Sequence, residues 1–144
     1  MAQKSGFQFK DFIVTESFIA RGTSKTKNEF DFRIEPSGII DHQTRVFQLT
    51  LDFFLQEEDS NLAIRVVAIG FFTFSGDFEE IKEYFTINAP AIMFPYLRSY
   101  ISAITALSGI DTIIIPTLNL LGMKEELEEN ITEKKNGEDN SVPK

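Results

Sequence analysis

The sequence predicts an α+β domain in which a four-stranded antiparallel sheet is backed on one face by a long helix and a C-terminal helix. In the first half of the chain, apolar residues alternate with polar ones in stretches separated by turn residues. The second half contains a helix of about four turns that is apolar on nearly every side. Strands in succession that are followed only by helices are typical of α+β proteins.

Each strand is expected from its own pattern. Residues 7–19 carry apolar side chains in both phases, which suits a strand covered by its own core on one face and by a partner on the other. Residues 29–34 alternate cleanly, and residues 36–38 (Pro-Ser-Gly) predict a break or turn. Residues 45–56 give the most regular alternation, and residues 62–75 return as a strand that is apolar on both faces.

The helices are expected to begin after this sheet. Residues 77–85 predict a short helix, and Asn88 is a plausible N-cap for the long helix, with Pro90 in its first turn. The long helix should stop near Gly109, before an extended stretch over residues 110–120. Residues 122–135 predict a charged second helix, so residues 1–135 form a single expected domain and residues 136–144 a polar, disordered tail.

Composition excludes several classes of function. The formal net charge of −8 argues against nucleic acid and against an anionic membrane surface as partners. The absence of cysteine excludes disulfides, thiolate zinc sites and a cysteine nucleophile. No apolar run reaches the ~18 residues of a membrane span, and the N-terminus has no signal-peptide core. A cytoplasmic protein without membrane insertion is therefore expected.

The sequence contains no recognisable catalytic constellation. It lacks a phosphate-binding loop and a nucleophile elbow. His42 is the sole histidine and lies between two strands, where we interpret it as a solvated loop residue. The acidic turn at residues 57–59 lacks the ligand alternation and central glycine of a calcium loop. We therefore expect no enzymatic activity, no cofactor and no metal.

An excess of apolar residues is the strongest functional signal. Most of residues 92–107 are apolar, which predicts a buried core helix, with an oligomer seam or a recognition groove as the sharper alternative. Ile113, Ile114 and Ile115 cannot all face one side of an extended segment. Either that segment is sandwiched, or part of it stays available to a client.

Three stretches resemble the signatures of the SecB family of protein-export chaperones. Residues 70–76 (GFFTFSG) resemble the end of that family's last sheet strand, and residues 89–98 (APAIMFPYLR) its long helix. Residues 116–120 (PTLNL) are similar to its crossover loop. The resemblance covers residues 70–120, and the strand pattern before it agrees.

The resemblance implies a holding chaperone that works without ATP. It would bind unfolded polypeptides on apolar grooves, keep them competent for Sec-dependent export and pass them to the SecA motor. The same resemblance implies a homotetramer built as a dimer of dimers, with the first strands and long helices at interfaces. One alternative is a SecB-like chaperone of a toxin–antitoxin system, which protects an antitoxin. Outside this family, the alternatives are a small apolar-ligand carrier, or an enzyme with a site built from scattered residues.

Departures from the family pattern concern docking of the motor. Glu16 falls near an acidic docking position, whereas Arg65 stands where the resemblance implies another acid. Residues 137–144 do not match the family's docking tail, and extra residues separate Gly109 from Pro116. Docking through Glu16 is therefore the least supported part of the resemblance.

The apolar residues are assigned to two surfaces. The client-binding groove is predicted to contain Phe72, Phe74, Ile113, Ile114, Ile115, Leu118 and Leu120. The oligomer interface is predicted to contain Phe12, Val14, Phe18, Tyr96, Tyr100, Ile104 and Leu107.

Overall fold

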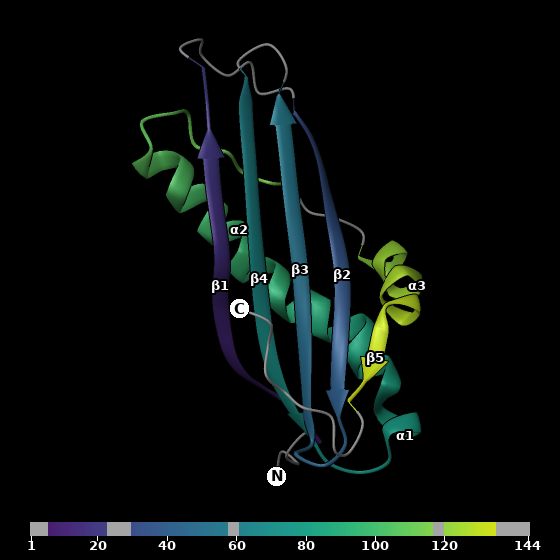
Figure 1. Cartoon of the computed structure of the whole chain (residues 1–144). Coiled ribbons are helices and arrows are strands. Elements are labelled where there is room, and N and C mark those ends of the chain that lie inside the picture. Colours follow the sequence, from purple (N-terminus) through teal and green to yellow (C-terminus); the bar gives the residue numbers. More distant parts are fainter. Residues whose placement is uncertain (1–5, 23–29, 58–60, 117–119, 135–144) are drawn as a thin grey trace.

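The chain forms a single sheet with its helices on one face (Figure 1). The computed structural model describes residues 6–22, 30–57, 61–116 and 120–134. The four long strands are antiparallel neighbours, namely β1 (Phe7–Ala20), β2 (Asp31–Asp41), β3 (Val46–Glu57) and β4 (Leu62–Phe74). The order across the sheet is β1-β4-β3-β2-β5. The predicted tail at residues 136–144 lies outside the described residues.

A short fifth strand makes the sheet mixed. β5 (Ile131–Glu133) pairs in parallel with residues 38–40 of β2, whereas a purely antiparallel sheet of four strands was predicted. The prediction of a helix through residue 135 is also wrong, because α3 (Leu121–Glu129) ends at Asn130. The carbonyl of Asn130 accepts a hydrogen bond from the Gly38 N–H at 3.2 Å. The outer edge of β2 thus provides hydrogen-bond partners for the backbone of residues 131–133. These backbone groups of β2 would stay unpaired if the helix continued.

The predicted break at residues 36–38 is absent, because β2 runs straight through it. Pro36 lies opposite Leu51 in an outer strand, where a missing N–H is tolerated if it faces the open edge. Gly38 is required for packing, since a Cβ there would lie 2.7 Å from the Phe47 ring. Pro36 is therefore accommodated by its position at the edge of the sheet. Gly38 is accommodated because it leaves room for the Phe47 ring.

Two irregularities change the expected phase of β1. The pairing register with β4 shifts between Phe9 and Asp11, and again between Val14 and Glu16. Each shift adds one unpaired residue, which turns the following side chains to the other face. As a result Phe12 and Val14 join Phe9 on the helix-covered face, while Phe18 lies on the open face opposite Arg65.

The helical region is longer and more continuous than predicted. Asp77 caps α1 (Phe78–Glu83) by accepting the Glu79 N–H at 3.3 Å. A π-helical turn (Tyr84–Asn88) then leads directly into α2 (Ala89–Leu107). Asn88 precedes the first residue of α2 and Pro90 lies in its first turn, as predicted, but the Asn88 side chain makes no capping bond because the chain is already helical there. The wider turn comes immediately before Pro90, which has no N–H for the helical ladder.

The core lies between α2 and the helix-covered face of the sheet. A Cβ at Gly70 would lie 2.4 Å from the Met93 sulfur, so this glycine lets α2 approach β4 closely. At one end of the core, Phe85 stacks on Phe47 with ring centroids 4.4 Å apart.

The predicted stop of the long helix is confirmed, since Gly109 follows the Ser108 cap with φ 77°. Within the described chain, no helix is long and apolar enough to cross a membrane.

Candidate functional site

The segment after α2 presents one isoleucine of three to solvent. It turns at the end of α2 and crosses behind the sheet towards α3 (Figure 1). Ile113 and Ile115 are buried in the core, whereas Ile114 is 61% exposed. Leu107, at the last position of α2, is 87% exposed. Of the three isoleucines assigned to a client groove, Ile114 alone is therefore accessible.

The other predicted groove residues have different positions. Phe72 is fully buried and Phe74 nearly so, and both belong to the aromatic core beneath α1 and α2. Leu118 lies outside the described residues. Leu120 is half-buried and lines a surface hollow beside α3. In this structure Leu120 and Ile114 are the members of that set with access to solvent.

The hollow beside Leu120 has a volume of about 330 Å³ and lies between β2 and α3. Its apolar lining includes Phe32, Ile34 and Met123, with Arg33 and Glu126 at its polar side. Reasoning from the sequence missed Phe32, Ile34 and Met123 as site residues. The alternation at residues 32–34 and the apolar stripe on α3 were visible, but only the tertiary structure brings them together.

The outer edge of β2 runs alongside this hollow. Residues 38–40 of that edge are paired with β5, and the side-chain amide of Asn130 approaches the Pro36 carbonyl at 3.5 Å. Before Pro36, the described chain provides no strand partner on this side. A second hollow of about 350 Å³, lined by Phe32, Arg33 and Phe54 among others, continues around the edge towards the open face. An open strand edge beside hollows with both apolar and charged lining residues can receive an extended peptide.

The opposite edge of the sheet is formed by β1 and flanked by aromatic rings. Tyr96 of α2 is 49% exposed, and its ring lies 5.2 Å from the Phe9 ring and 5.4 Å from the Phe12 ring. Within the described chain, β1 pairs with β4 alone. The predicted interface residues Val14, Tyr100 and Ile104 are half-buried and pack against the core. Tyr96 thus leaves part of an aromatic surface open along the outer edge of β1.

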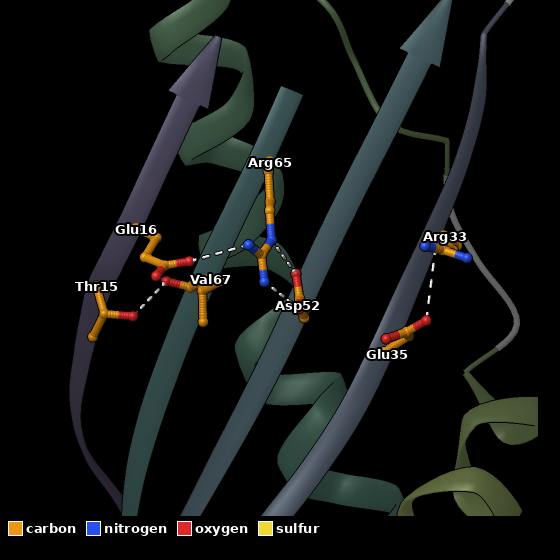
Figure 2. A network of polar contacts seen from close by, with 7 residues as sticks. All are labelled: Thr15, Glu16, Arg33, Glu35, Asp52, Arg65 and Val67. Atoms are coloured by element: carbon orange, nitrogen blue, oxygen red, sulfur yellow. Dashed lines mark hydrogen bonds and ion pairs between the residues drawn. The ribbon is translucent and has the colours of Figure 1, made fainter. Parts of the chain in front are cut away.

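The open face of the sheet carries a row of paired charges, shown in Figure 2. Arg65 on β4 donates two hydrogen bonds to Asp52 on β3, at 3.2 and 3.0 Å, and lies 3.5 Å from the carboxylate of Glu16 on β1. The hydrogen bonds that Arg65 donates to Asp52, together with the negative charges of Asp52 and Glu16, raise the pKa of Arg65. Glu16, assigned to motor docking, is therefore part of a network with a permanent cation.

One polar contact and one ion pair hold β5 and the residue after it to the β2–β3 turn. His42 Nε2 lies 3.3 Å from the Glu133 carboxylate, and Lys134 Nζ lies 3.2 Å from Asp41. The Thr44 N–H donates to Asp41, and with the other bonds of this turn it lowers the pKa of Asp41 to about 2. Among the described residues, no three His, Asp or Glu side chains converge to hold a metal. These polar groups hold the β2–β3 turn and β5 together.

Comparison with known proteins identifies the fold. No protein-family model matches the sequence. Over 63 residues the chain is 41% identical to the uncharacterized protein MJ0357 of Methanocaldococcus jannaschii, a match that spans 42% of this chain and 41% of that relative. The structure is similar to the SecB-like chaperone Rv1957 of Mycobacterium tuberculosis, solved in complex with a ChAD peptide from the HigA1 antitoxin, with a TM-score of 0.67.

This chain has the SecB-like fold. The superposition covers 78% of this chain and 90% of Rv1957, at 16% sequence identity. The resemblance read from residues 70–76 and 89–98 is therefore confirmed at the level of the fold. The added parallel strand β5 corrects the predicted sheet, and α2 and α3 correspond to the predicted long and C-terminal helices.

Proposed function

We propose that the protein is a holding chaperone that binds extended apolar segments of unfolded polypeptides without using ATP. The observation that carries the proposal is a SecB-like fold that leaves Ile114 exposed and an apolar hollow open beside the edge of β2. The client surface is defined here as Ile114, Leu120, Phe32, Ile34 and Met123. The proposal assigns no reaction and no cofactor, and it places the protein in the cytoplasm with its clients.

The energetics of such a surface suit reversible holding. A buried apolar area of a few hundred Å², at about 25 cal/mol per Å², gives a gross gain of roughly 5–10 kcal/mol. Ordering an unfolded client and losing its translational freedom cancel much of this gain. The acidic surface, with a formal net charge of −8, would favour neutral or basic client segments and keep the loaded complex in solution.

We also propose a homotetramer, built as a dimer of dimers, in which the edge of β1 and the outer face of α2 form the contacts. A strand edge of 14 residues without a partner in the described chain is a surface that natural proteins usually cover. Tyr96 supports this arrangement, because an exposed aromatic ring beside an open strand is typical of interface residues.

The charge network on the open face favours an antitoxin or a similar dedicated client over delivery to the SecA motor. The resemblance implies acidic docking residues on this face, and here Arg65 neutralises part of the charge of Glu16 and Asp52. The antitoxin peptide bound by Rv1957 supports the same choice. Export through SecA remains the second candidate, carried by the signatures at residues 70–120.

A direct binding measurement separates these two candidates. Isothermal titration with purified SecA should show no binding to the native protein. Arg65→Glu should gain measurable binding, because it restores an acid at the centre of the face, while Arg33→Glu serves as the control at its margin. Tight binding of SecA by the native protein would instead support the export candidate.

The ligand-carrier alternative gains no support from the described hollows. A carrier requires an enclosed apolar cavity. Both hollows open to solvent, and both include the charged residue Arg33 in their lining.

Aggregation of a denatured model protein tests the proposed function. The native protein should suppress light scattering at stoichiometric amounts, and Ile114→Asp should lose most of that effect without unfolding. The matched control is Ile39→Asp, which changes another exposed isoleucine on the opposite face of the sheet. Failure of the native protein to suppress aggregation, or equal losses in both variants, would contradict the proposal.

A further inference from the structure

Two hydroxyl groups on α2 bind both backbone groups of a single residue in the segment that follows the helix. Ser102 Oγ donates a hydrogen bond to the Ile113 carbonyl at 3.0 Å. The Ile113 N–H donates to Thr105 Oγ1, also at 3.0 Å. Thr105 is fully buried, so its oxygen is shielded from water. No backbone-to-backbone hydrogen bond holds residues 112–116 to the rest of the described chain.

The helix fixes the role of each hydroxyl. The Thr105 O–H points back to the carbonyls of Ile101, at 2.9 Å, and Ser102, at 3.0 Å. Its proton is therefore used within α2, and a lone pair is left to accept the Ile113 N–H. Ser102 supplies the complementary donor one turn earlier. The hydroxyls of Ser102 and Thr105 can therefore bind a single residue that turns both its N–H and its C=O towards α2.

Apolar burial favours the observed register of this segment by a single isoleucine side chain. Residues 113–115 are three identical isoleucines, and side chains of an extended chain alternate between faces. A shift by one residue would bury Ile114 and expose Ile113 and Ile115, so the segment would lose one buried isoleucine while an isoleucine could still occupy the position beside the two hydroxyls. The observed register buries Ile113 and Ile115, and Ile113 is the residue held by the two hydroxyls.

We propose that Ser102 and Thr105 are positioning residues that set this register and thereby turn Ile114 outwards to contact the client. The last step rests on the proposed holding function. The first step concerns the chain alone, so the two can be tested separately. Because an unmade hydrogen bond at a buried N–H is costly, loss of the Thr105 hydroxyl should free the segment to slip.

Thiol labelling reads the register directly, because the native chain contains no cysteine. Ile113→Cys, Ile114→Cys and Ile115→Cys are each treated with a maleimide, and the thiol at position 114 should react fastest. Adding Thr105→Val should speed labelling at position 113 by about tenfold and slow it at position 114. Adding Thr105→Ser should restore the native rates, because serine keeps the hydroxyl. Unchanged rates in the Thr105→Val background would overturn the inference.

A client assay then tests the link to function. Thr105→Val should hold less denatured client than the native protein, and Thr105→Ser should hold as much. If Thr105→Val does not fold, Ser102→Ala provides the second variant, since Ser102 is only half-buried. If Thr105→Val alters the labelling rates but holds as much client as the native protein, the inferred contact of Ile114 with the client is wrong. If Ile114→Asp itself holds client normally, the proposed function fails, while the labelling rates still decide the register.

Discussion

The two edges of the sheet are built differently. The edge of β1 is long, carries the Phe9, Phe12 and Tyr96 rings beside it and has no strand partner in the described chain. The edge of β2 is shortened by the chain itself, because β5 pairs with residues 38–40, and contacts of His42 with Glu133 and of Asp41 with Lys134 hold it there. Only a short stretch of the β2 edge stays open, and that stretch lies beside an apolar hollow.

This difference separates two kinds of partner. A long open edge with aromatic flanks suits a surface of equal length, such as a second copy of the chain. A short open edge beside a hollow suits an extended peptide that contributes a few side chains.

The largest effect is expected at the β1 edge. Tyr96→Asp should weaken assembly by about 2–4 kcal/mol, because a central tyrosine at an interface typically contributes that much. Light scattering should give the native protein a mass near four times 16.4 kDa and the variant a smaller one. Ile39→Asp, at the other edge, should leave the mass unchanged. A native monomer would remove the proposed role of β1.

A smaller effect is expected where β2 meets β5. Gly38→Ala should lower the free energy of unfolding by roughly 1–3 kcal/mol, because its Cβ would lie against the Phe47 ring. Urea denaturation measures this difference. Gly122→Ala is the matched control, since a Cβ there meets nothing within 4 Å. Equal stability of the two variants would show that β2 can move away from Phe47 at no cost.

The smallest effect is expected at low pH, at the end of β2 that lies beside β5. The folded state lowers the pKa of Asp41 from 3.8 to about 2, so the charged form stabilises the fold. That contribution is complete above pH 3.8 and is lost as the pH falls towards 2. Asp41→Asn should flatten this part of the stability profile in urea titrations, whereas Asp31→Asn, at the other end of the strand, should not. A native profile that is already flat here would contradict the assignment.

Local patterns predicted much of the fold, and interactions between distant segments account for the remainder. Regular alternation predicted β3 and β4, and Gly109 marked the end of α2, since each signal lies within the element itself. Strand β5 could not be predicted, because its residues continue a helical stripe and pair only where β2 offers an edge. Pro36 predicts a break from the sequence alone, because the sequence does not show that its strand has an open edge there.

The candidate site was predictable in part for the same reason. The sequence singled out three adjacent isoleucines, but the choice of Ile114 depends on hydroxyls eight or more residues away. Phe32 and Met123 are far apart in the chain, and no local signal joins them in one hollow. The assignment of Tyr96 to an oligomer interface stays a prediction, and its contacts with β1 depend on the register shifts of that strand.

Hydrogen exchange, measured with and without an unfolded client, reports which edge of the sheet the client covers. We predict that the client slows amide exchange at residues 31–35 of β2 and at Ile114. Exchange in β1 should already be slow in the free protein, because a second copy covers that edge, and should stay unchanged. Protection confined to β1 or to the open face, with none beside the β2–α3 hollow, would contradict the assignment of the two edges.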